Sequence, residues 1–293
     1  MGERKTVLVT GGAGSMGRGL VWILSQAGHC VRTFDLPFAD FSSLEGLEQV
    51  RVIRGDITEA REVRKAIRGV DAVVHLAAIL PPASEEDRER TMGVNVGGTR
   101  NVFEAMAREA PRAHLILSSS VSVYGDTIAS SPPIKVTHPR QALDFYAESK
   151  IGAEEIVLAS SLPYTILRIS GVAVPAFLAP PEVWPFMREQ RMEFVSRDDV
   201  VRALAACIET LEARGRIVNI TGGENWRMLG HQYVERFNQV LGLPPEEGRY
   251  LPRPGWFDWY DTSEGQAILD YQKTSFPRFL ELLRQAIEKA LEI

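Results

Sequence analysis

Short apolar runs alternate with longer amphipathic stretches through the first half of the chain. The apolar runs are typical of buried β-strands, and the amphipathic stretches are typical of helices that cover a sheet. The predicted strands are Thr6–Thr10, Cys30–Asp35, Val50–Arg54, Ala72–Leu76, His114–Ser118 and Tyr164–Ile169. The predicted helices are Ser15–Ala27, Glu59–Ile67, Ser84–Glu109 and Leu143–Ser160. This alternation predicts an α/β fold with a doubly wound parallel sheet and right-handed crossovers.

The pattern changes after Ile169, where a segment rich in proline and alanine begins. The elements predicted beyond it are a helix near Asp198–Leu211, a strand near Arg216–Ile220, a helix near His231–Leu241, an aromatic and proline-rich stretch at Leu243–Tyr260 and a helix over Phe276–Leu291. We therefore expect a nucleotide-binding domain at 1–170, to which 197–221 returns. Segments 171–196 and 222–293 are expected to form a smaller C-terminal substrate-binding lobe.

Composition limits the classes of function. The 293 residues are 45% hydrophobic and 24% charged, with a net charge of −5, as in an ordinary globular protein. This balance disfavours a nucleic-acid surface, and no apolar run approaches the ~18 residues of a membrane span. The two cysteines, Cys30 and Cys207, form no Cys-x-x-Cys pair, which disfavours a disulfide framework or a metal site. The N-terminal residues resemble no targeting signal, so we expect a cytoplasmic protein.

A glycine cluster directly follows the first predicted strand. Gly12-x-Gly14-x-x-Gly17 and Gly11-x-x-Gly14-x-x-Gly17 both fit a dinucleotide fingerprint of the Rossmann type. Such a turn brings the backbone against a pyrophosphate and offers it the N–H groups of a helix N-terminus. The alternative is a tight turn between strand and helix that binds no ligand.

Two carboxylates end the next strands. Asp35 is placed to accept hydrogen bonds from both ribose hydroxyls and to repel a 2′-phosphate, which favours NAD over NADP. Arg32 faces the other side by strand alternation. Asp56 ends the third strand and either holds the adenine edge or serves as a turn or helix-cap residue.

A tyrosine and a lysine lie one helical turn apart, at Tyr146 and Lys150. The serine run Ser118–Ser120 ends the fifth predicted strand, at the sheet edge where ligands bind in parallel sheets. An ammonium about 4 Å from a phenol is worth roughly 4 kcal/mol at an effective dielectric constant near 20. We therefore expect Lys150 to lower the pKa of Tyr146 far enough for it to act as a base near neutral pH.

Together these motifs resemble the NAD-dependent epimerase/dehydratase family, in the extended branch of the short-chain dehydrogenase/reductase superfamily. The resemblance covers roughly residues 5–211. It rests on Thr10-Gly-Gly-Ala-Gly-Ser-Met-Gly17, Gly55-Asp-Ile57, His75-Leu-Ala-Ala78, Asn95-Val-Gly-Gly-Thr99, Ser118-Ser-Ser-Val-Ser-Val-Tyr-Gly125, Tyr146-Ala-Glu-Ser-Lys150 and Arg197-Asp-Asp-Val-Val201.

The resemblance implies the site residues. Tyr146 would be the catalytic base or acid, Lys150 would lower its pKa and hold the nicotinamide ribose, and Ser120 would bind the substrate oxygen. Asn95 would brace the active-site helix, or serve only as a buried cap. The residues expected at NAD are Gly11, Gly14, Ser15, Met16, Gly17, Asp35, Asp56, Ile57, Leu76, Ala77, Ala78, Asn95, Ser118, Tyr146 and Lys150. The family also implies a homodimer formed by helices Ser84–Glu109 and Leu143–Ser160.

Some positions depart from the family pattern. The run Ser118–Ser122 lacks the threonine and Asp-Glu pair of dehydratases. Gly171 stands where sugar-nucleotide epimerases carry asparagine in an Arg-x-x-Asn pattern, and the insert before Arg197 is short. A smaller sugar, sugar acid or hydroxy acid would fit such a lobe. The C-terminal aromatics either stack on a sugar or fill the lobe core, and Arg253 meets an anion or lies in a solvated loop. These aromatics are Trp184, Trp226, Trp256, Phe257, Trp259 and Tyr260.

The sequence thus predicts an NAD-dependent oxidoreductase or epimerase of carbohydrate metabolism. It would transfer hydride at a secondary alcohol of a sugar or sugar-nucleotide-like substrate. The alternative is a dehydrogenase of a small sugar, sugar acid or hydroxy acid that releases NADH. A third hypothesis is a sensor that binds NAD without chemistry.

Overall fold

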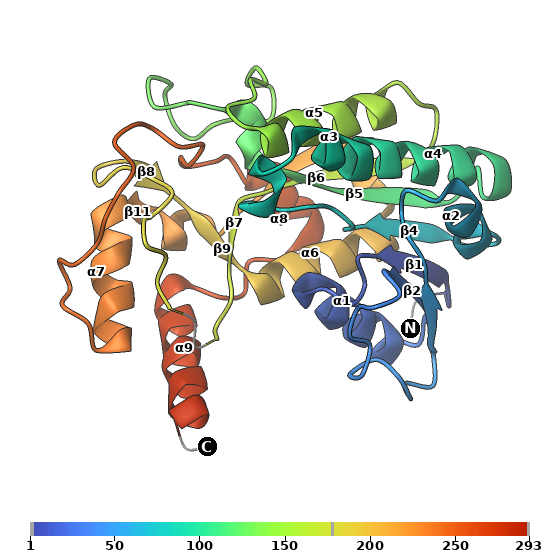
Figure 1. The fold of residues 1–293 in the computed structure, drawn as a ribbon, viewed down its shortest axis with the longest axis horizontal. Helices are drawn as coiled ribbons and strands as arrows, with labels where there is room; N and C mark the ends of the chain where they lie inside the picture. Colours follow the sequence, from blue (N-terminus) through green and yellow to red (C-terminus); the bar gives the residue numbers. More distant parts are fainter. Residues whose placement is uncertain (1–2, 177–178, 292–293) are drawn as a thin grey trace.

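The computed structural model describes residues 3–176 and 179–291, and its centre is a seven-stranded parallel sheet (Figure 1). The strand order is β10-β6-β5-β4-β1-β2-β3. The strands are β1 (Thr6–Thr10), β2 (Cys30–Asp35), β3 (Val50–Arg54), β4 (Ala72–His75), β5 (His114–Ser120), β6 (Tyr164–Ile169) and β10 (Arg216–Ile220). The predicted doubly wound sheet is confirmed, and the order reverses beside β1, so that a crevice can form there.

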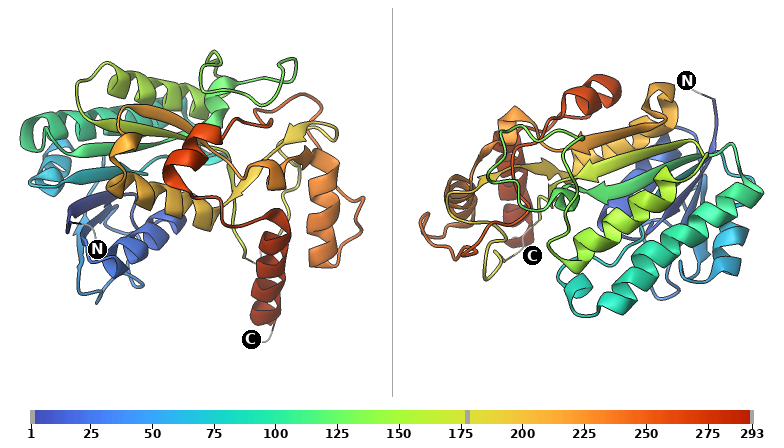
Figure 2. Two further views of the ribbon diagram at one scale, coloured as in Figure 1. Left: turned by 180° about the vertical axis from the view of Figure 1, so that it is seen from behind. Right: turned by 90° about the horizontal axis from the view of Figure 1, so that it is seen from above.

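Helices cover both faces of this sheet, as Figures 1 and 2 show. α1 (Ser15–Gln26) and α6 (Arg197–Glu209) pack on one face. α2 (Ala60–Ile67), α4 (Gly98–Glu109) and α5 (Phe145–Leu158) lie on the other. The alternation of side chains along β1 separates the two cores, because Val7 and Val9 join the first and Leu8 joins the second.

The predicted helix over Ser84–Glu109 is interrupted. Ala83–Glu85 form the 3₁₀ turn η1, and α3 (Arg88–Met92) begins only after Asp87, whose Oδ1 accepts from the N–H of Arg90 at 2.9 Å. The π-helical segment η2 (Gly93–Gly97) then joins α3 to α4. An N-cap carboxylate explains the late start, because it satisfies a first-turn N–H that has no partner within the helix.

Other boundaries shift by one or two residues. α5 begins at Phe145 rather than Leu143, because the Asp144 carboxylate caps it by accepting from the N–H of Ala147 at 2.7 Å. β5 runs on to Ser120, so the whole serine run belongs to the strand.

The remaining segments form a second cluster beside the carboxyl edge of the sheet. It contains β7 (Gly171–Ala173) paired with β9 (Phe194–Ser196), and β8 (Arg191–Met192) paired with β11 (Met228–Leu229). Its helices are α7 (Gly230–Leu241) and α9 (Phe276–Leu291). The cluster also contains the 3₁₀ turn η5 (Glu224–Trp226), and we call it the C-terminal lobe. Two further 3₁₀ turns lie outside it: η3 (Val121–Tyr124) follows β5, and η4 (Leu211–Ala213) follows α6.

Aromatic residues fill the core of the C-terminal lobe. Trp184, Trp226 and Phe257 are at most 5% exposed and lie in one hydrophobic cluster. Tyr260 is fully buried in a separate small cluster with Tyr124. These four aromatics therefore fill hydrophobic cores, which is one of the two roles predicted for them. Trp256 and Trp259 are partly buried, and Arg253 is exposed.

Helix α8 (Ser263–Leu269) was not predicted, and it packs on α6 and β10 rather than in the lobe. Leu269 and Tyr271 accordingly join the core of the main sheet. Within residues 3–176 and 179–291, no helix combines the length and apolar character that a membrane crossing requires.

Candidate active site

A cavity of about 510 Å³ opens at the carboxyl ends of β1, β2 and β4. Eleven of the predicted cofactor residues line it, and these are Gly11, Gly14, Ser15, Met16, Gly17, Asp35, Asp56, Ile57, Leu76, Ala77 and Ala78. Residues from four separate stretches of sequence therefore meet at one site, at the point where the strand order reverses.

The glycines shape the floor of the cavity. Gly11 has a φ of +68°, and a Cβ there would lie 2.8 Å from the backbone nitrogen of Ala77. A Cβ on Gly17 would lie 2.3 Å from the carbonyl oxygen of Gly11. At Gly14 such a Cβ would lie 3.3 Å from the carbonyl oxygen of Gly11, a tight contact but a looser one than those at Gly11 and Gly17. Gly14 also lines the cavity, where the lack of a side chain lets a ligand approach the backbone.

The N-terminus of α1 faces this space. Gly14 is its N-cap, and no side chain caps the helix. The first N–H groups of an uncapped helix and its dipole favour an anion. The residues present therefore fit a dinucleotide pyrophosphate.

Asp35 is fixed at the cavity wall. Its Oδ2 accepts from the N–H of Ala13 at 3.0 Å, and its Oδ1 accepts from the N–H of Leu36 at 2.8 Å. Each carboxylate oxygen keeps a further lone pair for a ribose hydroxyl. Arg32 points away, as predicted, and donates to the carbonyl oxygens of Ala66 and Arg68.

Asp56 lies at the cavity and also forms a turn interaction. It lines the cavity, and its Oδ1 also accepts from the N–H and hydroxyl of Thr58 at 2.9 and 2.8 Å. The turn interaction holds the carboxylate in place.

Tyr146 and Lys150 lie on one face of α5 beside the end of β5. Lys150 is buried, and its Nζ donates to the carbonyl oxygen of Ser118 at 2.9 Å. Nζ also lies 5.5 Å from the centroid of the Tyr146 ring. The Ser120 hydroxyl lies near enough to the Tyr146 phenol to influence its pKa, and it accepts from the N–H of Ser122 at 3.1 Å. The structure therefore brings the three predicted catalytic residues together.

The pKa of Tyr146 differs from the expectation. Burial, aided by the Asp144 carboxylate, raises the pKa of Tyr146, and the Ser120 hydroxyl opposes the rise only in part. Burial also lowers the pKa of Lys150 to about 8, against an opposing effect of Glu154. In this arrangement the pKa of Tyr146 therefore lies above its ordinary value rather than near neutrality, because burial disfavours the phenolate.

A layer of polar contacts positions α5. Asn95 is buried, and its side chain bonds to both backbone groups of Ile79 and donates to Ser149 Oγ at 2.9 Å. It lies behind the cavity wall, so the geometry supports bracing rather than direct contact with a cofactor. The Glu85 carboxylate accepts from the N–H groups of Phe145 and Tyr146 at 2.9 and 3.0 Å.

Sequence reasoning missed several residues of the cavity wall. Four of them are sequence neighbours of predicted cofactor residues, and this adjacency could have identified them. They are Phe34, Leu36, Gly55 and Ile79. Val94, Val172 and Val174 looked like ordinary core positions. Arg90, Leu80 and Arg197 also line the cavity, and Arg197 stood in a quoted motif without an assigned role. Ser118, Ser120, Asn95, Tyr146 and Lys150 lie outside this lining.

Comparison with known proteins agrees with this geometry. The NAD dependent epimerase/dehydratase family matches residues 7–183. The chain belongs to this family. The description of this family names NAD as its cofactor, and the cavity described above fits a dinucleotide.

Two curated relatives illustrate the sequence similarity. The chain is 37% identical over 164 residues to a 3 beta-hydroxysteroid dehydrogenase/Delta 5-->4-isomerase of Mycobacterium tuberculosis (strain CDC 1551 / Oshkosh), which is 54% of this chain and 44% of that protein. It is 30% identical over 202 residues to the Homo sapiens sterol-4-alpha-carboxylate 3-dehydrogenase, decarboxylating, covering 66% and 52%. The chain thus spans about half the length of these relatives.

Two solved structures share the fold along the whole chain. A short-chain dehydrogenase/reductase superfamily protein of Agrobacterium tumefaciens with bound NAD has a TM-score of 0.82 and 23% identity, covering 98% of both chains. A UDP-glucose 4-epimerase of Thermotoga maritima has a TM-score of 0.82 and 23% identity, covering 98% of this chain and 99% of that one.

Proposed function

We propose that this enzyme is an NAD-dependent dehydrogenase that oxidises a secondary alcohol and releases NADH. The observation that carries this proposal is that Ser120, Tyr146 and Lys150 lie together where α5 meets the end of β5. Its substrate is a small sugar, sugar acid or hydroxy acid, or another compact alcohol without a nucleotide diphosphate.

The chain's own residues divide the chemistry among them. Ser120 binds the substrate oxygen, and Tyr146 takes the proton of the substrate hydroxyl at its phenol oxygen. The Lys150 ammonium, held by the Ser118 carbonyl, favours the phenolate that Tyr146 must form. Bound NAD⁺ supplies a hydride acceptor. In the reverse direction Tyr146 returns the proton to the carbonyl oxygen, as its raised pKa favours.

Gly171 supports a substrate smaller than a sugar nucleotide. A Cβ at this position would lie 2.4 Å from the Phe194 ring and 3.0 Å from the Phe257 ring. The two rings fill the place in which related sugar-nucleotide epimerases would carry an asparagine side chain. Gaining that amide would require the lobe core to be rebuilt.

The relatives support net oxidation. Both are named as dehydrogenases, one of a hydroxysteroid and one of a sterol carboxylate, and part of the wall of this cavity is aliphatic, from Leu80, Val172 and Val174. A compact apolar alcohol therefore belongs in the substrate panel beside sugars.

The second candidate is an epimerase that keeps its NAD and acts on a sugar or sugar nucleotide. The same triad serves both reactions, because an epimerase also begins by removing hydride and proton from a secondary alcohol.

The test is absorbance at 340 nm with sugars, uronic acids, hydroxy acids, nucleotide sugars and a 3β-hydroxysteroid, with and without added NAD. A dehydrogenase gives absorbance that grows with added NAD. Co-purified NAD, no net reduction and an inverted sugar stereocentre would establish the epimerase instead.

Tyr146→Phe should lower the turnover of the active substrate at least 100-fold, because the proton acceptor is lost. Its affinity for NAD should stay within threefold of wild type in calorimetry. Full turnover by this variant would overturn the proposed role of Tyr146.

A further inference from the structure

Two arginines reach the nucleotide cavity from opposite sides of the sheet. Arg90 comes from α3, which packs against α5, and Arg197 begins α6, which packs against α1 (Figure 1). Neither arginine was assigned a function by sequence reasoning. Both lie on the wall that includes the uncapped start of α1.

The lining of the cavity carries charges of both signs. Asp35 ends β2 and Asp56 follows β3, at one edge of the sheet. Arg90 and Arg197 come from segments that follow β4 and β9. These four residues are the charged members of the lining in the part of the chain that the structure describes.

The guanidinium groups retain donors for a ligand. Arg197 directs Nε and Nη2 to a single oxygen of its neighbour Asp198, both at 3.2 Å, which leaves Nη1 without a partner among the described residues. The Arg90 side chain has no hydrogen bond or ion pair within residues 3–176 and 179–291. Its backbone is fixed all the same, because its N–H donates to Asp87.

We propose that Arg90 and Arg197 form a cationic clamp that holds the phosphoryl oxygens of the dinucleotide between them and over the start of α1. This inference rests on the proposed site, and it assigns two residues that the glycine fingerprint does not include. Arginine suits the task because its planar group donates two parallel hydrogen bonds to a phosphate. The carboxylates of Asp35 and Asp56 would bind ribose hydroxyls, so the two kinds of charge serve different parts of the nucleotide.

The test is the equilibrium binding of NAD and ADP-ribose, measured by calorimetry, to wild type, Arg90→Met, Arg197→Met and the double variant. Each single variant should lose about tenfold in affinity, and the double variant about 100-fold. The salt dependence of binding should weaken in the same order. Arg100→Met, in an exposed position of α4, is the matched control and should bind as wild type does.

Adenosine separates the clamp from a structural effect, because it carries no phosphate. Its binding, followed by ligand-observed NMR, should be the same in all five proteins. An equal loss of adenosine binding, or wild-type affinity of the double variant for ADP-ribose, would overturn the clamp.

An anionic substrate is the other kind of ligand that Arg90 and Arg197 would bind. If the variants bind NAD normally but show a raised KM for a carboxylate or phosphate substrate, the clamp on the dinucleotide is refuted and the arginines serve the substrate. Failure of the proposed function is distinct, because wild type would then bind NAD yet oxidise no substrate.

Discussion

The proposed chemistry depends on the ammonium group of Lys150, which is buried. Its side chain is 5% exposed, and burial lowers its pKa to about 8 from an ordinary 10.5. The folded chain therefore binds this proton less readily than the unfolded chain does. Below pH 8 the buried charge reduces the stability of the fold, and the loss is relieved as pH rises from about 8 toward 10.5.

Lys150→Met should abolish turnover and yet stabilise the protein. At pH 7 the free energy of unfolding in urea should rise by about 2 kcal/mol, because relief of desolvation exceeds the lost bond to Ser118. The difference from wild type should shrink as pH increases to 10. The exposed residue Lys135 gives the control, since Lys135→Met should show no such pH dependence. A gap that widens with pH would contradict this account.

Among single residues, the sequence predicted those whose type is required by one particular backbone conformation or interaction. The left-handed Gly11 and the strand-end Asp35 stand where their chemistry requires them. The raised pKa of Tyr146 was not predictable, because desolvation depends on what the fold packs around the phenol. Arg90 was missed since an exposed arginine in a charged helix looks the same whether or not a cavity lies beside it.

Among the elements, α5 is the one that fixes the site, and a buried ion pair ties it to the sheet. Arg168 of β6 donates Nε and Nη2 to the two oxygens of Glu154 at 2.9 and 2.7 Å. Ser119 of β5 donates to Glu154 as well, at 2.6 Å. Glu154 is fully buried and lies one turn after Lys150, so the same contact orients the catalytic face of the helix.

Glu154→Gln should lower the free energy of unfolding by about 3 kcal/mol, because it leaves the buried Arg168 guanidinium without a counter-charge. Urea denaturation measures this loss. The neighbouring Glu155 side chain is 64% exposed, so Glu155→Gln should change stability by less than about 1 kcal/mol. Equal stability of the two variants would show that the pair does not tie α5 to the sheet.

The types and order of the main-sheet elements followed from hydrophobic periodicity, and Val50–Arg54 and Tyr164–Ile169 match the structure residue for residue. The interrupted helix before Glu109 did not follow, because its start depends on the Asp87 cap and π-helical winding leaves no periodicity of its own. The two-residue strands β8 and β11 are too short for any pattern, and only tertiary pairing creates them.

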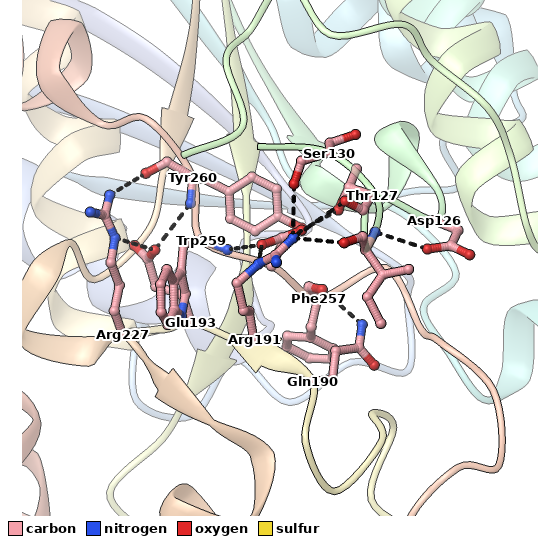
Figure 3. A network of polar contacts seen from close by, with 12 residues as sticks. Asp126, Thr127, Ser130, Gln190, Arg191, Glu193, Arg227, Phe257, Trp259 and Tyr260 are labelled. Carbon is pink, nitrogen blue, oxygen red and sulfur yellow. Dashed lines mark hydrogen bonds and ion pairs between the residues drawn. The ribbon is translucent and has the colours of Figure 1, made fainter. Parts of the chain in front are cut away.

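In the whole molecule, one arginine connects the lobe to the loop before α5. Arg191 of β8 pairs with Asp258 through Nε at 2.6 Å and Nη2 at 2.9 Å. Nη2 also donates to the carbonyl oxygens of Ile128 and Ser130 at 3.1 Å, and Thr127 Oγ1 donates to Asp258 at 2.7 Å. Figure 3 shows these contacts converging between the segments.

Asp258→Asn should loosen this connection, because the Asp258 carboxylate is buried and its partner would lose its counter-charge. We expect a loss of roughly 2 kcal/mol in stability and a raised KM for the substrate. NAD affinity should not change, because Arg191 and Asp258 lie outside the nucleotide cavity. Glu182→Gln, in an exposed lobe ion pair, is the control. A parallel loss of NAD affinity would show that the lobe also supports the cofactor site.

The predicted two-part organisation and the homodimer through α4 and α5 remain proposals at this scale. The regular alternation of strands and helices in the sequence ends near Ile169 for a physical reason. The lobe core is aromatic and assembled from distant segments, so no local periodicity encodes it.

The lobe's discontinuity in sequence has a consequence for how such enzymes diverge. Its aromatic core draws on residues 173–194 and on residues from 226 onward, while α6 and β10 between them belong to the sheet. A single crossover within residues 195–225 would therefore join half a lobe to a foreign half and leave mismatched rings in the core, while one before residue 173 would carry α6 and β10 along with the lobe. New specificities on this scaffold would arise by point substitution or by paired exchange of both segments, with the nucleotide cradle carried along unaltered.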